Sequence, residues 1–235
     1  MKLIIVIPAI NHFFNELQAS IYSLNTLVPI GTPVYIFDNG LTPIQLTLLE
    51  NNFKFVDIKL IDQKLTLMDR KSYRFKSLAF DYLIKTNKLT DEVLLYMDSK
   101  THLKYHWKEL EKMLSNRPVW SGDKYGFEHE WTNIKAIEKM GFDDIEKIQN
   151  MHHLQAWVML IDYNTQAGKN VLNDYIHYCK DDEIIYPNHT YKGFDTADPL
   201  NHRQDQSVFS LVIKKNNVDF SSWVPFVSHH NTMFS

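Results

Sequence analysis

The protein has 235 residues, and its 25 lysine and arginine residues against 28 acidic ones give a formal net charge of −3 with the 11 histidines neutral. This near-neutral balance lacks the broad basic surface of nonspecific nucleic-acid binders, so we expect no nucleic-acid partner. With 44% hydrophobic and 23% charged residues, the composition is that of a soluble globular protein rather than a disordered or fibrous one. The length suits a single folded unit.

The single cysteine, Cys179, cannot form an internal disulfide, which is typical of a reducing compartment and favours a cytoplasmic location. Its simplest interpretation is a small buried hydrophobic residue. The N-terminal apolar run Leu3–Ile7 is too short for the hydrophobic region of a signal peptide. No stretch approaches the ~18 apolar residues of a transmembrane helix, so we expect no transmembrane segment.

The first hundred residues alternate short apolar runs, which predict buried strands, with segments of helical periodicity. The predicted strands are Leu3–Ile7, Val34–Phe37, Val56–Ile61 and Val93–Met97. The predicted helices are Leu17–Val28, which ends before Pro29, then Ile44–Glu50 and Phe75–Leu83. Continuous apolar strands are typical of a parallel sheet covered on both faces. We therefore predict an α/β fold with a mostly parallel central sheet flanked by helices.

The pattern becomes more irregular beyond Thr101, and this part of the chain carries most of the histidines. The predicted elements are a helix at Trp107–Leu114, a strand at Val119–Trp120, helical segments up to Met151, a strand at Ala156–Ile161, and helices at Ala167–Cys179 and Asp205–Lys214. No linker or internal repeat interrupts the chain. We predict one domain over residues 1–235, made of two halves at 1–104 and 105–235.

Three loops follow predicted strands, and ligands of open α/β sheets bind outside the carboxyl ends of the strands. The loops are Pro8, Ala9, Ile10 and Asn11; Asp38, Asn39 and Gly40; and Asp98, Ser99 and Lys100. No glycine-rich phosphate loop of the G-x-G-x-x-G or G-x-x-x-x-G-K-[ST] kind occurs, so any phosphate is held in another way. Asp98 is well placed to hold a divalent cation, and the alternative is that it caps the following turn.

The segment Val93-Leu94-Leu95-Tyr96-Met97-Asp98-Ser99-Lys100-Thr101 resembles the "vlYlDaDt" segment of glycosyltransferases with the GT-A fold, where an Asp-x-Asp motif binds the metal and diphosphate of a nucleotide-sugar donor. Gln155–Ile161 is similar to the "nsGvmli" strand of the glycogenin-like branch, and Arg203–Phe209 to the start of its "DQ" helix. The order of these motifs makes the resemblance specific. Lys100 stands where the family has its second aspartate, and the family's C-terminal His-x-x-Gly-x-x-Lys-Pro-Trp is absent.

The resemblance implies transfer of a hexose or pentose from a nucleoside diphosphate sugar, with a UDP-sugar as the favoured donor. The acceptor is a hydroxyl of a glycan, lipid or protein, and residues 1–104 form the donor half and 105–235 the acceptor half. It also implies a Mn²⁺ or Mg²⁺ ion on Asp98 and His230, with His229 as the fallback. The alternative is a metal-free site in which Lys100 and other basic side chains replace the ion.

The loop after the first strand, Pro8–Asn11, belongs to the expected donor site together with Ser99. Asp38 and Asn39 are expected to bind the base or ribose, and the alternative is that Asp-Asn-Gly forms a turn of the Asx or I′ kind. A basic cluster lies around the start of the helix before Asp98. Arg70 and Lys76 are its predicted phosphate contacts.

Asp205 and Gln206 are the catalytic positions that the resemblance implies. An aspartate beside a sugar can hold its hydroxyls or act as a general base; the alternative is a helix-terminal aspartate favoured by the helix dipole. Asp123, which follows the strand at 119–120, is a third catalytic candidate on the acceptor side. Glu128 and Glu130 are open alternatives for the base.

Two other classes of function stay open at this point. A sugar-nucleotide nucleotidyltransferase normally needs a glycine-rich phosphate loop after the first strand, which Pro8–Asn11 lacks. In a non-catalytic module that binds a nucleotide sugar or a glycan, Lys100 would have replaced a carboxylate needed for turnover.

Overall fold

A computed structural model of the protein describes residues 1–61, 63–187, 202–220 and 227–229. Its centre is a six-stranded sheet in the order β3-β2-β1-β4-β9-β6. The strands are β1 (Leu3–Ala9), β2 (Thr32–Asp38), β3 (Val56–Ile61), β4 (Val93–Met97), β6 (Val119–Ser121) and β9 (Val158–Asp162). The first four run parallel, and β9 runs antiparallel to both β4 and β6. The predicted α/β class with a mostly parallel sheet is confirmed.

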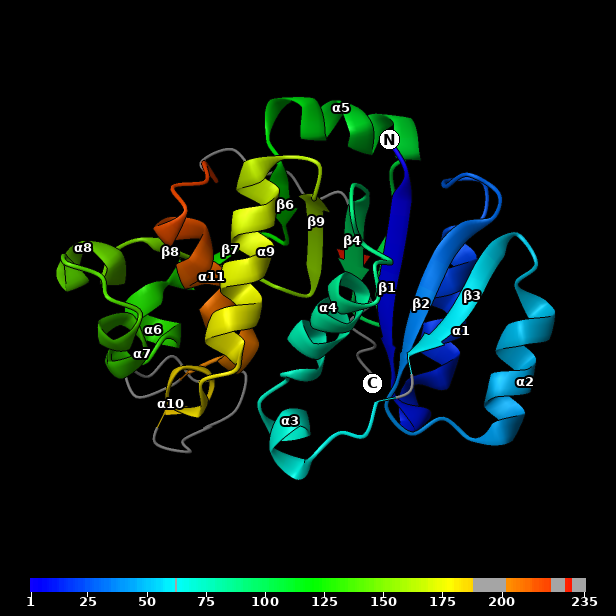
Figure 1. The fold of residues 1–235 in the computed structure, drawn as a ribbon, viewed down its shortest axis with the longest axis horizontal. Helices are drawn as coiled ribbons and strands as arrows, with labels where there is room; N and C mark the ends of the chain where they lie inside the picture. The colour runs from blue at the N-terminus through cyan, green and yellow to red at the C-terminus, as the bar shows by residue number, and fades with distance from the viewer. Residues whose placement is uncertain (62, 188–201, 221–226, 230–235) are drawn as a thin grey trace, which may run out of the picture.

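Helices cover both faces of this sheet (Figure 1). In Figure 1, α4 (Phe75–Lys85) and α9 (Gln166–Cys179) lie side by side in front of the sheet, and α1 (Phe14–Ser23) lies behind β2 and β3. The other helices are the 3-10 turn η1 (Asn11–Phe13), α2 (Pro43–Asn52), α3 (Leu67–Lys71), α5 (Trp107–Asn116), α6 (Glu128–Trp131), α7 (Ile134–Lys139), α8 (Ile145–Gln149), α10 (Asp182–Ile185) and α11 (Gln204–Lys215).

The core sits between the sheet and these helices. Every residue of β1, β4 and β9 is buried, as expected for strands that are apolar along their whole length. Cys179, at the end of α9, is fully buried, and burial raises the pKa of its thiol far above the ordinary value. The prediction that Cys179 is a small buried residue is confirmed.

One helix ends earlier than its apolar pattern predicts. α1 ends at Ser23 instead of continuing to Val28, because Thr26 takes a φ of 66°, which lies in the left-handed region and cannot continue a right-handed helix. Leu24 and Val28 are still buried, so the apolar spacing correctly marks the core-facing positions while the helix itself stops early.

Two small antiparallel ladders were not predicted. β7 (Lys124–Phe127) pairs with β8 (His152–Leu154), and β5 (Thr101–Leu103) pairs with β10 (Val227–His229). Strands of three or four residues give too few positions for an alternating pattern to be recognised. The second ladder brings residues 227–229 beside the segment that follows β4.

No helix in the described part of the chain has the length and apolar character needed to cross a lipid bilayer.

The strand register determines which strand ends lie together at one edge of the sheet. Ala9 at the end of β1 pairs with Asp38 at the end of β2, and Met97 at the end of β4 pairs with Val158 at the beginning of β9. The carboxyl ends of the parallel strands therefore share one edge of the sheet with the segment that leads into β9.

Candidate active site

A cavity of about 620 Å³ opens at this edge. Its lining comes from the loop after β1, the residues around the start of α4, the segment Asp98–Lys100, the residues before β9, and the residues 203–206 at the start of α11. This volume is in the range of sites that enclose a small molecule of drug or cofactor size. The cavity thus joins segments from both halves of the chain.

Lys76 on α4 ties two carboxylates together on the cavity wall. Its Nζ lies 2.9 Å from Asp205 Oδ2 and 3.6 Å from Asp98 Oδ1, and it donates a hydrogen bond to the carbonyl of Ala156 at 3.1 Å. Lys76 is only 5% exposed. Burial alone would lower its pKa, but the negative charges of Asp205 and Asp98 outweigh burial and raise it, so Lys76 stays protonated.

Asp205 is buried at the first turn of α11. Burial raises the pKa of its carboxyl to about 6, against the pull of the Lys76 ammonium group, and the charge of Asp98 adds to the rise. Tyr175 on α9 donates a hydrogen bond to Asp205 Oδ2 at 3.3 Å. Asp205 is therefore a carboxylate at neutral pH that takes up a proton in mildly acidic solution.

Asp98 follows β4 directly and is half-buried. Tyr96 donates its hydroxyl hydrogen to Asp98 Oδ1 at 2.5 Å, and the backbone N–H of Asp98 donates to the carbonyl of Trp157 at 2.8 Å. Both side-chain contacts fall on Oδ1. Within the described residues, no hydrogen bond or ion pair involves Asp98 Oδ2, so this oxygen is available to a ligand.

Lys100 adds a second positive charge to the same wall. Its ammonium group lies 3.9 Å from the centre of the Phe13 ring, close enough for a cation–π contact. Asp98 is therefore flanked by two lysines, one buried and paired and one on an aromatic face.

Two residues on the cavity wall have a backbone in the left-handed region, which residues other than glycine rarely adopt. Tyr73, which precedes α4, has a φ of 56°, and Gln204 at the start of α11 has a φ of 42°. Such strain persists where the surrounding structure enforces it, and it is found often at functional sites. At this site it lies next to the two helices that carry Lys76 and Asp205.

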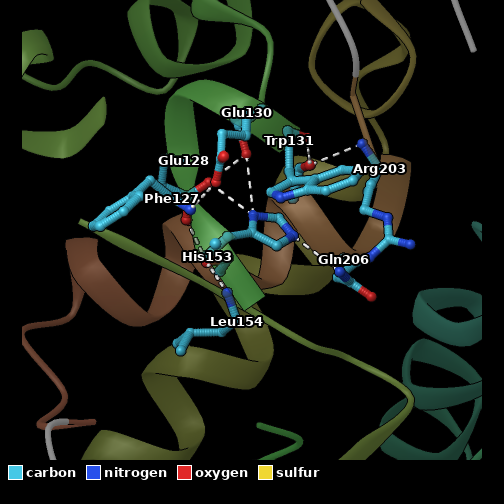
Figure 2. A network of polar contacts seen from close by, with 12 residues as sticks. Phe127, Glu128, Glu130, Trp131, His153, Leu154, Arg203 and Gln206 are labelled. Carbon is cyan, nitrogen blue, oxygen red and sulfur yellow. Dashed lines mark hydrogen bonds and ion pairs between the residues drawn. The ribbon is translucent and has the colours of Figure 1, made fainter. Parts of the chain in front are cut away.

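Gln206, the neighbour of Asp205, reaches from the cavity into a second polar cluster (Figure 2). Its Nε2 lies 2.9 Å from Nε2 of His153, and Nδ1 of His153 lies 2.9 Å from Oε2 of Glu128. Glu128 also accepts hydrogen bonds from Lys214 at 2.6 Å, and from Thr132 and Ser210. Glu128 and His153 are both fully buried.

Arg203 lines the cavity and lies beside two aromatic rings that contact each other. Its guanidinium carbon is 5.0 Å from the ring centre of Tyr125 and 4.7 Å from that of Trp131. The backbone N–H of Arg203 donates to the carbonyl of Trp131 at 3.1 Å. These contacts hold the start of α11 against β7 and α6.

Many of the residues predicted for the site line this cavity. Pro8, Ile10, Lys76, Asp98, Ser99, Lys100, Asp205 and Gln206 are among its lining residues. Ala9 is buried at the end of β1 and does not line it, and the side chain of Asn11 is outside the described part. Trp157 lines the cavity, whereas Trp120 is buried and donates its ring N–H to Met113.

Besides Ala9, four predicted site residues do not line this cavity. Asp38 uses Oδ1 to accept hydrogen bonds from the backbone of Gly40 and Leu41, at 2.9 and 2.8 Å, so it forms the turn that was its alternative role. Asn39 donates its backbone N–H to Ala9 at 2.8 Å, beside β1. Arg70 is exposed near the end of α3, and Asp123 is exposed and accepts from the backbone of Lys124.

The metal assignment depends partly on residues outside the described part. His230 lies there, while the backbone of His229 pairs with Thr101, three residues after Asp98. No group of three or more histidine, cysteine, aspartate or glutamate side chains suited to a metal ion occurs among the described residues. The pairing of β10 with β5 thus places the backbone of residues 227–229 beside the segment that follows Asp98.

The sequence interpretation missed the network behind Gln206. It treated Glu128 as an open alternative for the base, although Glu128 is fully buried and does not line the cavity. A signal was available: Gln206, Ser210 and Lys214 are spaced by four along α11. This spacing places three polar residues on one face of α11.

Comparison with known proteins finds no matching family model and no match among curated proteins. Solved structures do match. The galactosyltransferase LgtC, in complex with donor and acceptor sugar analogues, has 12% identity and a TM-score of 0.53, with 97% of this chain and 86% of that chain covered. Mouse xyloside xylosyltransferase 1 in its apo form has 10% identity and a TM-score of 0.50, with 91% and 81% covered.

The apo structure of WbbM, a bifunctional glycosyltransferase, has 12% identity and a TM-score of 0.55 over 90% of this chain. This chain spans only 37% of the length of WbbM. At these identities the likeness concerns the path of the backbone. The described sheet, its helical layers and these structural neighbours together show that the chain has a GT-A glycosyltransferase fold.

Proposed function

We propose that the protein is a glycosyltransferase that moves a sugar from a nucleoside diphosphate sugar, a UDP-sugar in the favoured version, to a hydroxyl of a glycan, lipid or protein. The observation that carries the proposal is the convergence of Asp98 and Asp205 on Lys76 inside one cavity at the carboxyl edge of the sheet. Ligands of open α/β sheets bind at this edge. The glycosyltransferase names of the structural neighbours support the same reaction class.

The charges around the cavity suit a departing diphosphate. Glycosyl transfer develops positive charge on the sugar and negative charge on the leaving group. Lys100 lies beside Asp98 at the end of β4 and is the residue proposed to stabilise the phosphates. Lys76 is held by two carboxylates, so its proposed role is to hold Asp205 and Asp98 in place rather than to bind phosphate alone.

Asp205 and Gln206 are the proposed sugar-side residues. Asp205 has a pKa of about 6, so it is negatively charged at higher pH. Its carboxylate can then accept a hydrogen bond or a proton from a hydroxyl. Gln206 lies next to it and lines the same cavity. Asn39 and Asp38 remain proposed for the nucleoside end, on the neighbouring strand β2.

A divalent ion fits the site in one respect. The Oδ2 atom of Asp98 faces no partner among the described residues, and Mg²⁺ or Mn²⁺ is bound in many enzymes by one carboxylate together with substrate phosphates. We propose Asp98 and a C-terminal histidine, His230 or His229, as its protein ligands. When bound, the ion would act as a Lewis acid on the leaving diphosphate.

The decisive experiment measures release of UDP or GDP from a panel of nucleotide sugars, with and without Mn²⁺, in the presence of glycan, lipid and peptide acceptors. Nucleotide release coupled to a glycosylated product is the expected result. Binding of a nucleotide sugar with no turnover in any combination would contradict transferase activity and favour a non-catalytic binding module.

A further inference from the structure

The chemistry of the cluster behind Gln206 fixes which way its amide points. Glu128 is fully buried, so burial opposes its negative charge, but Lys214 and His153 outweigh burial and hold the pKa of the carboxyl well below its ordinary value. Glu128 is therefore an acceptor on both oxygens. Its Oε1 faces Lys214 and Ser210, and its Oε2 faces His153 and Thr132.

His153 must place its proton on the nitrogen that faces this carboxylate. Burial lowers the pKa of the imidazole despite the opposing effect of Glu128, so the ring is neutral at pH 7. A neutral imidazole carries one N–H, and Nδ1 lies 2.9 Å from Glu128 Oε2. The proton is therefore on Nδ1, and Nε2 offers only a lone pair.

The bare Nε2 atom of His153 then determines the orientation of the Gln206 amide. The side-chain atom 2.9 Å from Nε2 must be a donor, which makes it the NH₂ group of Gln206 and not its carbonyl oxygen. Figure 2 shows the Gln206 oxygen on the side of the amide away from His153. Gln206 lines the cavity, so the oxygen turned away from His153 is the amide atom that it can offer to a ligand there.

We infer that Glu128 and His153 are positioning residues that hold the Gln206 carbonyl oxygen toward the cavity, where it accepts a hydrogen bond from a hydroxyl of the bound sugar. This inference rests on the proposed function for the identity of the ligand. The orientation of the amide rests only on the cluster itself. Neither Glu128 nor His153 touches the cavity, so both act through Gln206.

The first test is a measurement on the unmodified protein, and a substitution serves only to assign the signal. The ¹⁵N shifts of the His153 imidazole in the unmodified protein, assigned by the loss of its signal in His153→Phe, report which nitrogen is protonated. We expect Nδ1–H and an unprotonated Nε2 at pH 7. A proton on Nε2 would overturn the inference, because Gln206 would then have to present its oxygen to His153.

The second test reverses the tautomer. In Glu128→Gln, Lys214 retains the side-chain oxygen, so the new amide NH₂ faces His153 and moves its proton to Nε2. Gln206 must then turn its NH₂ group toward the cavity. We expect the ¹⁵N signature to switch and kcat to fall about tenfold, with an unchanged KM for the donor.

Glu146→Gln is the control, because it makes the same change at an exposed position on α8 that belongs to neither cluster. It should leave both the ¹⁵N signature and kcat unchanged. A switched tautomer with an unchanged kcat in Glu128→Gln would overturn the positioning role.

A third variant covers the case in which Glu128→Gln does not fold. His153→Phe removes the acceptor of Gln206 but leaves Glu128 paired with Lys214, and it should lower kcat by a similar factor with KM retained. If the unmodified protein turns over no nucleotide sugar at all, the proposed function fails, while the ¹⁵N result still decides the orientation of Gln206.

Discussion

Two buried clusters of lysine and carboxylate meet at the start of α11, and they differ in what they face. In the first, Lys76 joins Asp98 and Asp205 on the wall of a cavity, and the Asp98 side chain is 31% exposed. In the second, Lys214 joins Glu128, and both side chains are at most 1% exposed. The same pair of residue types is thus proposed to serve ligand binding where a carboxylate is open, and positioning where it is fully buried.

The difference follows from the sequence of α11. Asp205 points to the first cluster, and Gln206, Ser210 and Lys214 point to the second. A shift of one residue along a helix turns a side chain by about 100°, so neighbours face different surroundings. The four predictions below test this division, beginning with the largest expected effect.

Glu128→Ala is expected to lower the free energy of unfolding by about 3–5 kcal/mol. It leaves the Lys214 ammonium group buried without its counterion, and breaking a buried pair from one side has costs of this order. Urea denaturation measures the loss. Glu146→Ala, at an exposed position on α8, is the control and should leave stability unchanged. A stable Glu128→Ala variant would show that the sealed cluster contributes little to folding.

Asp98→Ala is expected to reduce kcat/KM by about 10²-fold or more while the protein stays folded, because it removes the open carboxylate from the proposed diphosphate site. Nucleotide release and donor binding, each measured with and without Mn²⁺, check this. Asp91→Ala, at an exposed position before β4, is the control. If the metal assignment is correct, donor binding by Asp98→Ala also loses its response to Mn²⁺.

The pH profile of kcat/KM is expected to fall about tenfold per unit below a pH near 6, because protonation of Asp205 removes the acceptor. Lys76 lowers the pKa of Asp205, so Lys76→Met should move this acidic limb to higher pH. Steady-state kinetics from pH 4.5 to 8 measure both effects. An acidic limb that stays in place in Lys76→Met would contradict the assignment to Asp205.

Lys100→Ala has the smallest expected effect, a reduction of about tenfold in donor affinity, because Lys100 is only partly buried and acts alongside the other charges of the site. Titration with a nucleotide sugar in Mn²⁺ and in excess EDTA measures it. A larger loss in Lys100→Ala than in Asp98→Ala, together with full activity in EDTA, would favour the metal-free alternative.

The sheet and the individual residues of the first cluster could be predicted because their signals are local. Continuous apolar runs predicted the central strands, and polar residues directly after β1 and β4 marked the edge at which the cavity opens. Lys76 was chosen from its cluster as a ligand contact, but its burial between Asp98 and Asp205 depends on how α4 and α11 meet. That contact joins residues more than a hundred positions apart, and no sequence spacing reports it.

The second cluster could not be assembled for the same reason. Gln206 lies on the predicted helix α11, but Glu128 and His153 come from short, irregular regions. The strands β7 and β8, which bring these two residues together, have too few residues to be recognised. Asp38 shows the opposite case. Its turn chemistry is local and was foreseen as an alternative, and the structure displays that turn.

The buried thiol of Cys179 can serve as a chemical probe of local opening in this protein. As the only cysteine, it lies fully buried at the end of α9, and its backbone carbonyl accepts a hydrogen bond from Arg74 at 2.7 Å, next to α4. A thiol-specific reagent can reach it only when these two helices separate. The rate of alkylation therefore measures how often the wall that carries Lys76 opens, and a ligand that binds the closed cavity would slow it in proportion to its occupancy.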